Sequence, residues 1–232
     1  MKIAIFSDIH GNIFAFEQIY RQIKKENCDL HLFLGDICGY YYHQNEVIEI
    51  LKTIPNLFSI AGNHDLLFLK SLDNAKVMTE YSKTYGRSFE FLKASITPPN
   101  LEFLKQLSPE FILPRLDLAA FHGSPWNPVS QYVYPDSLTE RFDELPYKVV
   151  FLGHTHYTMD IHREHMRIIN PGSVGQPRDG GWPSYALYNT ENDQLAFKRV
   201  QYDVDAQVAD ILGREDANSY LIEVLMRMGE KI

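Results

Sequence analysis

Five short apolar runs in this chain are each followed, within two residues, by Asp, Asn or His. The first run is Ile3 to Phe6, and continuous apolar character of this kind predicts a strand that is buried on both faces. Residues two positions apart in extended chain point to the same side, so Asp8 and His10 can converge on one ion. The five polar motifs are Asp8-Ile9-His10, Gly35-Asp36, Gly62-Asn63-His64-Asp65, His122-Gly123 and Gly153-His154-Thr155-His156.

The first three motifs are separated by segments with helical spacing of their apolar residues. Strands are predicted at 3–6, 30–34 and 57–61, with helices over 13–23 and 45–52 between them. A β-α-β-α-β order predicts parallel strands, and such sheets bind ligands beyond the carboxyl ends of their strands. We therefore expect an α/β fold in which the polar motifs meet at one edge of the sheet.

No candidate ligand lies between Asn63 and His122, and this part of the chain is expected to be mainly helical. Val77 to Leu92 keep helical spacing, which predicts one helix that is ended by Pro98-Pro99. A shorter helix is predicted around Leu101 to Leu107. We expect residues 64–110 to form a helical insertion over one side of the sheet, with a role as a lid left open.

The second half of the chain predicts further strands and two closing helices. The loop 123–135 is rich in Pro and aromatic residues, which fits either a loop pinned by its own contacts or a pocket wall. Residues 1–232 are expected to form a single domain. Strands are predicted at 111–113, 116–121 and 149–152, antiparallel strands at 159–162, 167–170, 185–188 and 195–200, and helices within 203–229.

The composition is that of an ordinary globular protein, with 45% hydrophobic and 22% charged residues. Lys and Arg number 22 against 30 Asp and Glu, and the net charge of −8 argues against a protein that holds long nucleic acid by its phosphates. No apolar stretch approaches the roughly 20 residues of a membrane span. The first strand begins directly after Met1, without a signal peptide, and two cysteines make no disulfide framework. We expect a cytoplasmic protein.

The residue types in the motifs indicate a metal centre. Imidazole and oxygen donors without thiolates suit Mn, Fe, Zn or Ni better than they suit a structural zinc, and Mn is the ion we expect. Two ions that lie roughly 3.5–4 Å apart need a bridging ligand. Asp36 is the candidate because its carboxylate, at the end of a central strand, has an oxygen for each side.

In this order, the motifs resemble those of the calcineurin-like metallophosphoesterase superfamily. The small bacterial and archaeal phosphodiesterase-like members are the most similar, because they share Asp-x-His-Gly-Asn, here Asp8 to Asn12. They also share Pro-Gly-Ser-Val-Gly-Gln-Pro-Arg, here Pro171 to Arg178, and a Tyr-Asp pair before C-terminal helices, here Tyr202-Asp203. The resemblance extends over nearly the whole chain and implies a four-layer α/β/β/α sandwich.

The resemblance also implies the site and its chemistry. His64 would protonate the leaving group or stabilise its charge, while a hydroxide held between two divalent ions would attack phosphorus in line. Asn12 and Arg178 are the candidate substrate-binding residues. One ion would be held by Asp8, His10, Asp36 and His156, and the other by Asp36, Asn63, His122 and His154.

The second motif departs from that of the Ser/Thr protein phosphatases of this superfamily. Those resemble Gly-Asp-x-Val-Asp-Arg-Gly, whereas this chain reads Gly35 to Tyr41 without the phosphate-clamping Arg and without the Asp that orients the acid His. Arg178 is either a substitute for that Arg or part of a surface salt bridge. Tyr40, Trp126 or Tyr132 could hold the organic group of an ester by stacking.

Hydrolysis of small phosphodiesters is therefore the expected activity. Phosphomonoesters or nucleotides are the alternative substrates. A non-catalytic metal-binding scaffold is the alternative of another class, and it predicts substitutions among the ligands or loss of His64, neither of which occurs in this chain.

Overall fold

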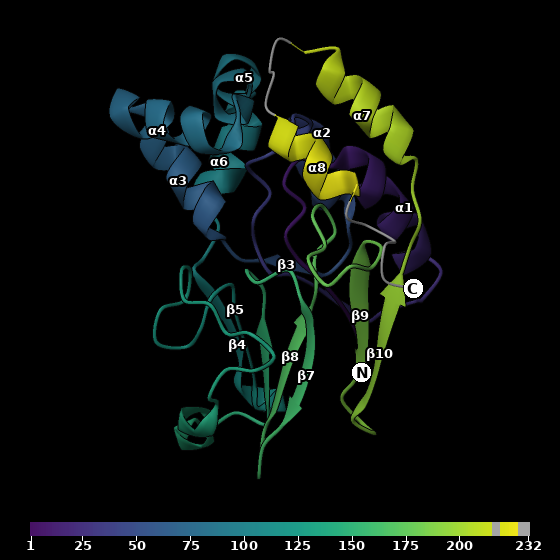
Figure 1. Ribbon diagram of the computed structural model, residues 1–232. Helices are drawn as coiled ribbons and strands as arrows, with labels where there is room; N and C mark the ends of the chain where they lie inside the picture. Colours follow the sequence, from purple (N-terminus) through teal and green to yellow (C-terminus); the bar gives the residue numbers. More distant parts are fainter. Residues whose placement is uncertain (215–218, 227–232) are drawn as a thin grey trace.

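Two five-stranded mixed sheets face each other in the computed structural model, which describes residues 1–214 and 219–226 (Figure 1). The first sheet has the order β10-β9-β1-β2-β3, and the second has the order β4-β5-β6-β8-β7. The strands of the first sheet are β1 (Lys2–Phe6), β2 (Leu30–Phe33), β3 (Leu57–Ser59), β9 (Ser184–Asn189) and β10 (Gln194–Arg199). Those of the second are β4 (Glu110–Leu113), β5 (Leu118–Phe121), β6 (Val149–Leu152), β7 (Thr158–His162) and β8 (Arg167–Pro171).

Apolar side chains from both sheets form the central core. Ile3 and Ile5 of β1 pack in one buried cluster with Leu32 of β2, Phe151 of β6 and Ile169 of β8. The predicted burial of β1 on both faces is confirmed, since four of its five residues are buried, and all four residues of β2 are buried as well. In β3 no residue is buried, and Phe58 is exposed. The α/β class is confirmed as well.

Two helices cover the outer face of the first sheet, as predicted for its β-α-β-α-β beginning. α1 (Ile13–Ile23) and α2 (Gln44–Thr53) bring their apolar faces into a second buried cluster with Phe6 and Phe33. β1 pairs with β2 and β2 with β3 in parallel, so their carboxyl ends lie at the same edge. The central strand of the first sheet is β1. Asp36 follows β2, which is the neighbour of the central strand and not the central strand itself.

The segment from Asn63 to Lys105 contains four helices, more than the sequence predicted. They are α3 (Asn63–Leu72), α4 (Ala75–Tyr85), α5 (Ser88–Ser95) and α6 (Pro98–Lys105). The prediction of one helix through Val77 to Leu92 is wrong, because Gly86 has a φ of 88° and ends α4. Pro98 starts α6, since a helix tolerates proline in its first turn, where the missing N–H has no intrahelical partner.

The second sheet differs from the prediction in one pairing. β8 is antiparallel to β7, as expected, but parallel to β6. The outer face of the second sheet is covered by residues 123–147. This described stretch contains a 3-10 helix (Glu140–Glu144) and no α-helix. Phe142 and Trp126 pack there against Phe121 and Leu152, so this irregular segment forms the fourth layer.

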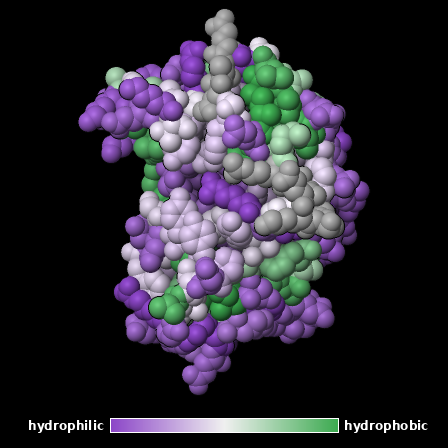
Figure 2. Space-filling model, viewed as in Figure 1, coloured by the Kyte–Doolittle hydropathy of each residue, from purple (hydrophilic) through white to green (hydrophobic). Residues whose placement is uncertain are grey.

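Two helices close the described part of the chain. α7 (Val204–Leu212) and α8 (Ser219–Met226) lie within the predicted range 203–229, of which 215–218 and 227–229 fall outside the described residues. Leu221 and Leu225 of α8 pack on Tyr40 and Tyr41, in the loop after β2. Figure 2 shows hydrophobic residues gathered over α7 on an otherwise largely hydrophilic face. Among the described residues, no helix combines the length and the apolar character that crossing a membrane requires.

Candidate metal centre

The loops at the carboxyl ends of β1, β2, β5 and β6 meet at one edge of the two sheets, together with the first turn of α3. These loops carry the seven residues that the sequence proposed as metal ligands. All of them are buried except Asn63, which is partly exposed. Six of them form two groups whose ligand atoms lie within 4.8 Å of one another, namely Asp8, His10 and His156, and Asp36, His122 and His154.

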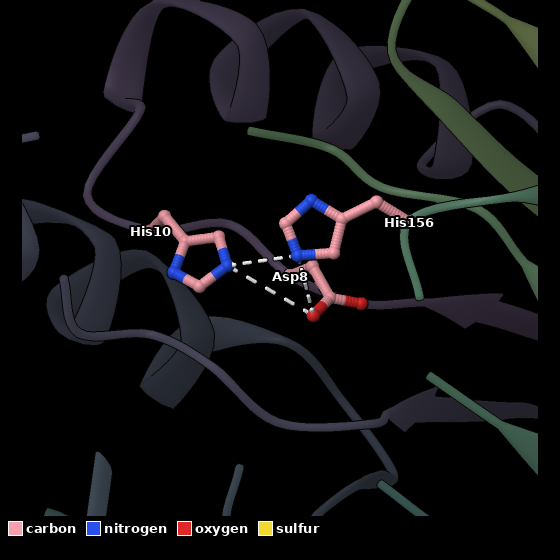
Figure 3. A group of neighbouring side chains, drawn as sticks. All are labelled: Asp8, His10 and His156. Atoms are coloured by element: carbon pink, nitrogen blue, oxygen red, sulfur yellow. Dashed lines mark hydrogen bonds and ion pairs between the residues drawn. The ribbon is translucent and has the colours of Figure 1, made fainter. Parts of the chain in front are cut away.

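The first group combines the loop after β1 with the loop after β6 (Figure 3). His156 Nε2 lies 3.3 Å from Asp8 Oδ1, and His10 Nε2 lies 3.9 Å from the same oxygen. The two Nε2 atoms are 3.2 Å apart. Two imidazole nitrogens and one carboxylate oxygen thus point at one small space, an arrangement suited to a divalent cation.

In the second group, the His122 imidazole lies beside the carboxylate of Asp36 and the amide of Asn63. His122 Nε2 lies 3.3 Å from Asp36 Oδ2 and 3.1 Å from Asn63 Oδ1. The ring of His154 lies 4.9 Å from that of His122, between centroids. Asn63 therefore stands beside this group, where its amide oxygen could complete the donor set.

Asp36 lies between the two groups. Its Oδ2 atom is 3.6 Å from His10 Nε2 in the first group and 3.3 Å from His122 Nε2 in the second. Its Oδ1 atom accepts the backbone N–H of His64 at 2.8 Å, which fixes the carboxylate plane. This position is the one that a bridging ligand between two ions requires.

Several of these residues adopt a backbone conformation that L-amino acids seldom take. The φ angles of Asp8, His10, Asp36, His154 and His156 are 56°, 52°, 65°, 66° and 64°. Such residues are uncommon outside turns, and strained ones cluster at functional sites, where the surrounding fold holds them against the local strain. The strain here coincides with the convergence of the side chains.

Backbone carbonyls orient three of the four imidazoles. Each carbonyl oxygen accepts a hydrogen bond from Nδ1 of its histidine. In the neutral ring, Nε2 then carries the lone pair and faces the centre of the site. Hydrogen bonds of this kind commonly fix the tautomer and ring orientation of metal-binding histidines. The pairs are His10 Nδ1 with Cys38 O at 2.8 Å, His122 Nδ1 with Leu34 O at 2.7 Å, and His156 Nδ1 with Gln176 O at 2.7 Å.

The centre of the site has polar atoms that lack protein partners. Asp8 Oδ1, Asp36 Oδ2 and His154 Nε2 are buried and make no hydrogen bond within the described structure. Burial lowers the pKa of His10, and it lowers that of His154 to about 4, so both rings are neutral at pH 7. Neutral imidazoles and buried carboxylates are the forms that bind cations, and the residues therefore fit two divalent ions.

The pKa of His122 also indicates that the buried carboxylates of the site favour a positive charge beside them. Burial alone would lower the pKa of His122, but the carboxylate of Asp36 and that of Asp8 raise it to about 9. A proton on His122 thus balances the two carboxylates in the absence of a cation. Metal binding at Nε2 would displace the proton from that nitrogen, because one ring nitrogen cannot bind a proton and a metal ion together, whereas Nδ1 keeps its proton toward Leu34 O.

Asp65 is a residue of the site that the sequence did not single out. Its buried carboxylate accepts four backbone hydrogen bonds, two of which come from Asp36 at 2.9 Å and Gly62 at 3.0 Å. The other two come from Ile37 and Cys38, both at 2.9 Å. Asp65 therefore holds the loop that carries Asp36, and its place directly after Asn63-His64 was the available signal.

His64 lies beside the candidate ligands rather than among them. Its ring centroid is 5.0 Å from that of His10, and the ring belongs to neither group. Nδ1 is buried without a hydrogen-bond partner in the described residues, in keeping with the missing Asp of the second motif. The geometry leaves His64 free to contact a substrate that binds between the two groups.

The side chain of Asn12 is occupied by hydrogen bonds within the protein. Its side-chain oxygen accepts the N–H of Ala15 and caps α1, while its amide nitrogen donates to Gly175 O at 3.0 Å and to Tyr202 Oη at 3.3 Å. The side chain is fully buried. These contacts connect α1 to the loop 171–178, and they do not favour the prediction that Asn12 binds substrate.

Arg178 lies next to the site, in contact with Tyr40 and His156. No carboxylate of the described residues pairs with Arg178, whereas its neighbour Asp179 pairs with Arg199 at 2.6 Å. The Nη2 atom of Arg178 donates to Tyr40 Oη at 3.4 Å, and its backbone N–H donates to His156 O at 3.2 Å. A partly buried guanidinium with no carboxylate partner among the described residues has the chemistry to bind an anion.

The aromatic residues proposed for stacking lie in three different settings. The ring of Tyr132 stacks on that of His154, with centroids 3.9 Å apart, and is 48% exposed. Tyr40 is buried against His10. Trp126 packs on Phe142, away from the site, which agrees with a loop pinned by its own contacts, while a role of loop 123–135 as a pocket wall stays a prediction.

Comparison with known proteins agrees with this geometry. The model of the calcineurin-like phosphoesterase superfamily domain matches residues 1–193. An uncharacterized protein from Methanocaldococcus jannaschii is 30% identical in a match that covers 87% of this chain and 88% of that protein. A metallophosphoesterase from Sphaerobacter thermophilus superposes with a TM-score of 0.83 at 27% identity, over 98% of this chain and 99% of that one. A hypothetical protein from Pyrococcus horikoshii shares the fold, with a TM-score of 0.81 at 22% identity and 97% of both chains covered.

The family model and the archaeal relative agree with the resemblance seen in the sequence motifs, and the bacterial metallophosphoesterase shares the arrangement of both sheets. The chain belongs to the calcineurin-like phosphoesterase superfamily.

Proposed function

We propose that this protein is a dinuclear metal-dependent phosphoesterase that hydrolyses small phosphodiesters. The observation that carries the proposal is the position of Asp36 Oδ2 between two groups of buried imidazole and carboxylate ligands. The proposed ligands of one ion are Asp8, His10, Asp36 and His156, and those of the other are Asp36, Asn63, His122 and His154.

The donor set suggests the kind of ion. Nitrogen and oxygen donors without thiolate favour Mn, Fe, Zn or Ni, and we propose Mn as the working ion. Two such ions would activate a water molecule and stabilise charge on the phosphoryl oxygens. The backbone carbonyls of Leu34, Cys38 and Gln176, which accept from Nδ1 of three of the histidines, would keep these ligands in place.

His64 is the proposed general acid. Its ring lies beside the ligand groups. Its backbone N–H donates to Asp36, so the position of His64 is fixed relative to the proposed bridging ligand. A proton from this imidazole would pass to the leaving-group oxygen as the ester bond breaks. His64 is expected to matter most for alcohols that are poor leaving groups.

The substrate proposal depends on the surroundings of the ions. A phosphodiester carries one negative charge and a second organic group, and Tyr132 offers a half-exposed ring at the edge of the site. The net charge of −8 does not favour a long nucleic acid as substrate. Small diesters with an aryl or nucleoside group are therefore the proposed class.

A second candidate, phosphomonoester hydrolysis, is favoured by Arg178. A monoester dianion concentrates charge, and the guanidinium of Arg178, which pairs with no carboxylate of the described residues, could bind it. This residue is the cationic clamp that the second motif lacks. The two substrate classes thus differ in how much they depend on Arg178.

The test compares bis(p-nitrophenyl) phosphate with p-nitrophenyl phosphate on the Mn-loaded protein and on Arg178→Ala. We expect kcat/KM to be higher for the diester in both proteins. Arg141→Ala is the matched control, because Arg141 lies over the Trp126 ring on the outer face of the second sheet. A preference for the monoester that disappears in Arg178→Ala would establish the second candidate. Metal binding by calorimetry without turnover of either ester would point to the non-catalytic scaffold.

A further inference from the structure

The imidazole of His64 is enclosed by aromatic rings from three segments of the chain. The ring of His10 lies 5.0 Å from it at 80°, and the ring of Tyr40 lies 5.1 Å from it at 36°. Tyr81 and Tyr85 of α4 complete the enclosure at 5.8 Å and 5.5 Å, with interplanar angles of 85° and 67°. We call these three tyrosines the tyrosine cage.

The cage stands where a carboxylate would orient the acid histidine. His64 Nδ1 is buried and makes no hydrogen bond within the described residues, and the second motif lacks the Asp of the protein phosphatases. The orientation of the imidazole must therefore come from packing. Edge-to-face contacts between rings have a preferred geometry and are worth about 0.5–1.5 kcal/mol each beyond burial.

Tyr81 and Tyr85 are themselves held firmly. The hydroxyl of Tyr81 accepts the backbone N–H of Tyr40 at 3.0 Å, and its buried ring stacks on Phe89. The ring of Tyr85 contacts Tyr40 at 5.4 Å and Tyr81 at 5.1 Å, so that each member of the cage supports the others.

Gly39 shows how tightly the cage closes. A Cβ atom at this position would lie 2.7 Å from His64 Nδ1 and 2.8 Å from Tyr81 Oη. The φ of Gly39 is 96°, a value that also favours glycine. The space behind Nδ1 is thus filled by backbone, which leaves the imidazole little freedom to rotate away.

We propose that Tyr81 and Tyr85 are positioning residues for His64, a role that rests on the phosphoesterase proposed above. Together with Tyr40 they hold the imidazole toward the leaving group by packing alone. The helical segment from Asn63 to Lys105 is then a fixed wall of the active site, and its helix α4 substitutes for the missing carboxylate.

The experiment measures leaving-group dependence in Tyr85→Leu, using bis(p-nitrophenyl) phosphate and diphenyl phosphate on the metal-loaded protein. Phenolate needs a proton more than p-nitrophenolate does, so a displaced acid slows the diphenyl ester selectively. We expect kcat for diphenyl phosphate to fall about 10-fold more than kcat for the nitrophenyl ester, because small displacements of catalytic groups have large effects. Metal content and KM should stay unchanged, and Tyr85→Phe, which retains the ring, should restore the wild-type ratio.

Three further proteins sharpen the test. Tyr81→Phe keeps the buried ring and removes only the hydroxyl that binds Tyr40, and it should shift the ratio in the same direction. In a His64→Gln background, Tyr85→Leu should cause no further selective loss, because the two residues act as one unit. Tyr20→Leu is the matched control, since Tyr20 is a partly buried helical tyrosine that stacks on Phe16 in α1.

The outcomes separate the inference from the function on which it rests. Equal losses for both esters in Tyr85→Leu, or losses that add to those of His64→Gln, would show that the cage only stabilises the fold and would overturn the inference. Absence of turnover in the wild-type protein with every metal would instead overturn the phosphoesterase itself.

Discussion

Replacement of Asp65 by Asn is predicted to destabilise the protein more than its conservative chemistry suggests. The Asp65 carboxylate lies within hydrogen-bonding distance of four backbone N–H groups, two at each oxygen. An amide has one oxygen, so its NH₂ group would face two N–H donors. Two hydrogen bonds to a charged acceptor would be lost at a buried position.

The magnitude follows from those two bonds. Hydrogen bonds to charged groups contribute about 1.5–3 kcal/mol each, so Asp65→Asn should lower the free energy of unfolding by about 3–6 kcal/mol. Burial, together with the carboxylate of Asp36, raises the pKa of Asp65 to about 6, so the measurement belongs at pH 8, where the carboxylate is ionised. That loss is a large part of the roughly 5–15 kcal/mol by which globular proteins are stable.

Urea denaturation of the chelator-treated protein measures the effect without metal linkage. With a urea m-value of about 3 kcal/mol/M, the unfolding midpoint should fall by roughly 1–2 M. Asp203→Asn is the matched control, because Asp203 accepts one backbone N–H, from Ala206, at the start of α7, and Asn caps helices equally well. A loss below about 1 kcal/mol with an unchanged m-value would refute the argument that the carboxylate holds all four N–H groups.

Three further predictions concern the metal centre. Elemental analysis should find that Asp36→Asn removes both ions and that Asp8→Asn removes only one, since Asp36 Oδ2 faces both ligand groups. Equal losses of metal from the two variants would contradict a bridging role for Asp36. His64→Gln should retain both ions yet lose roughly 10²–10⁴-fold in turnover of diphenyl phosphate and less with p-nitrophenyl esters; a missing ion would make His64 a ligand or its support. Burial lowers the pKa of His154 to about 4 from 6.5, so the folded state resists a protonation that the unfolded chain accepts. The metal-free protein should therefore lose stability as pH falls from 6.5 to about 4, less so in His154→Gln, and identical pH profiles of unfolding would refute this assignment.

Much of the fold and of the candidate centre could be predicted because the relevant patterns are local. The apolar run of β1 and the Asp8-Ile9-His10 that follows it lie within ten residues, and burial on both faces requires such a run. The same reasoning applies at Asp36, at His122 and at the pair His154 and His156. Parallel pairing brings the ends of β1 and β2 to one edge of the first sheet, as the βαβ order already implied, and the ends of β5 and β6 to one edge of the second.

The predictions that failed concern contacts between distant segments or a single backbone angle. The interruption of the helix through Val77 to Leu92 depends on Gly86, and a left-handed glycine costs little wherever packing requires a turn. The parallel pairing of β8 with β6 places β8 between β6 and β7 in the second sheet. This strand order is not visible in the local sequence of β8. The substrate-binding role of Asn12 stays a prediction, and its amide nitrogen donates to Gly175 and Tyr202, more than 160 residues away.

Tertiary structure alone decided what surrounds the reactive groups. Asp65 acquires three of its four donors because the turn after β2 folds onto the start of α3, and Arg178 meets Tyr40 across 138 positions of the chain. The cage around His64 joins the loop after β2 to α4, whose tyrosines looked in the sequence like ordinary helical core residues. Ligand motifs are visible in sequence because each lies in one turn of chain, whereas the groups that orient them come from whichever segments the core packs alongside.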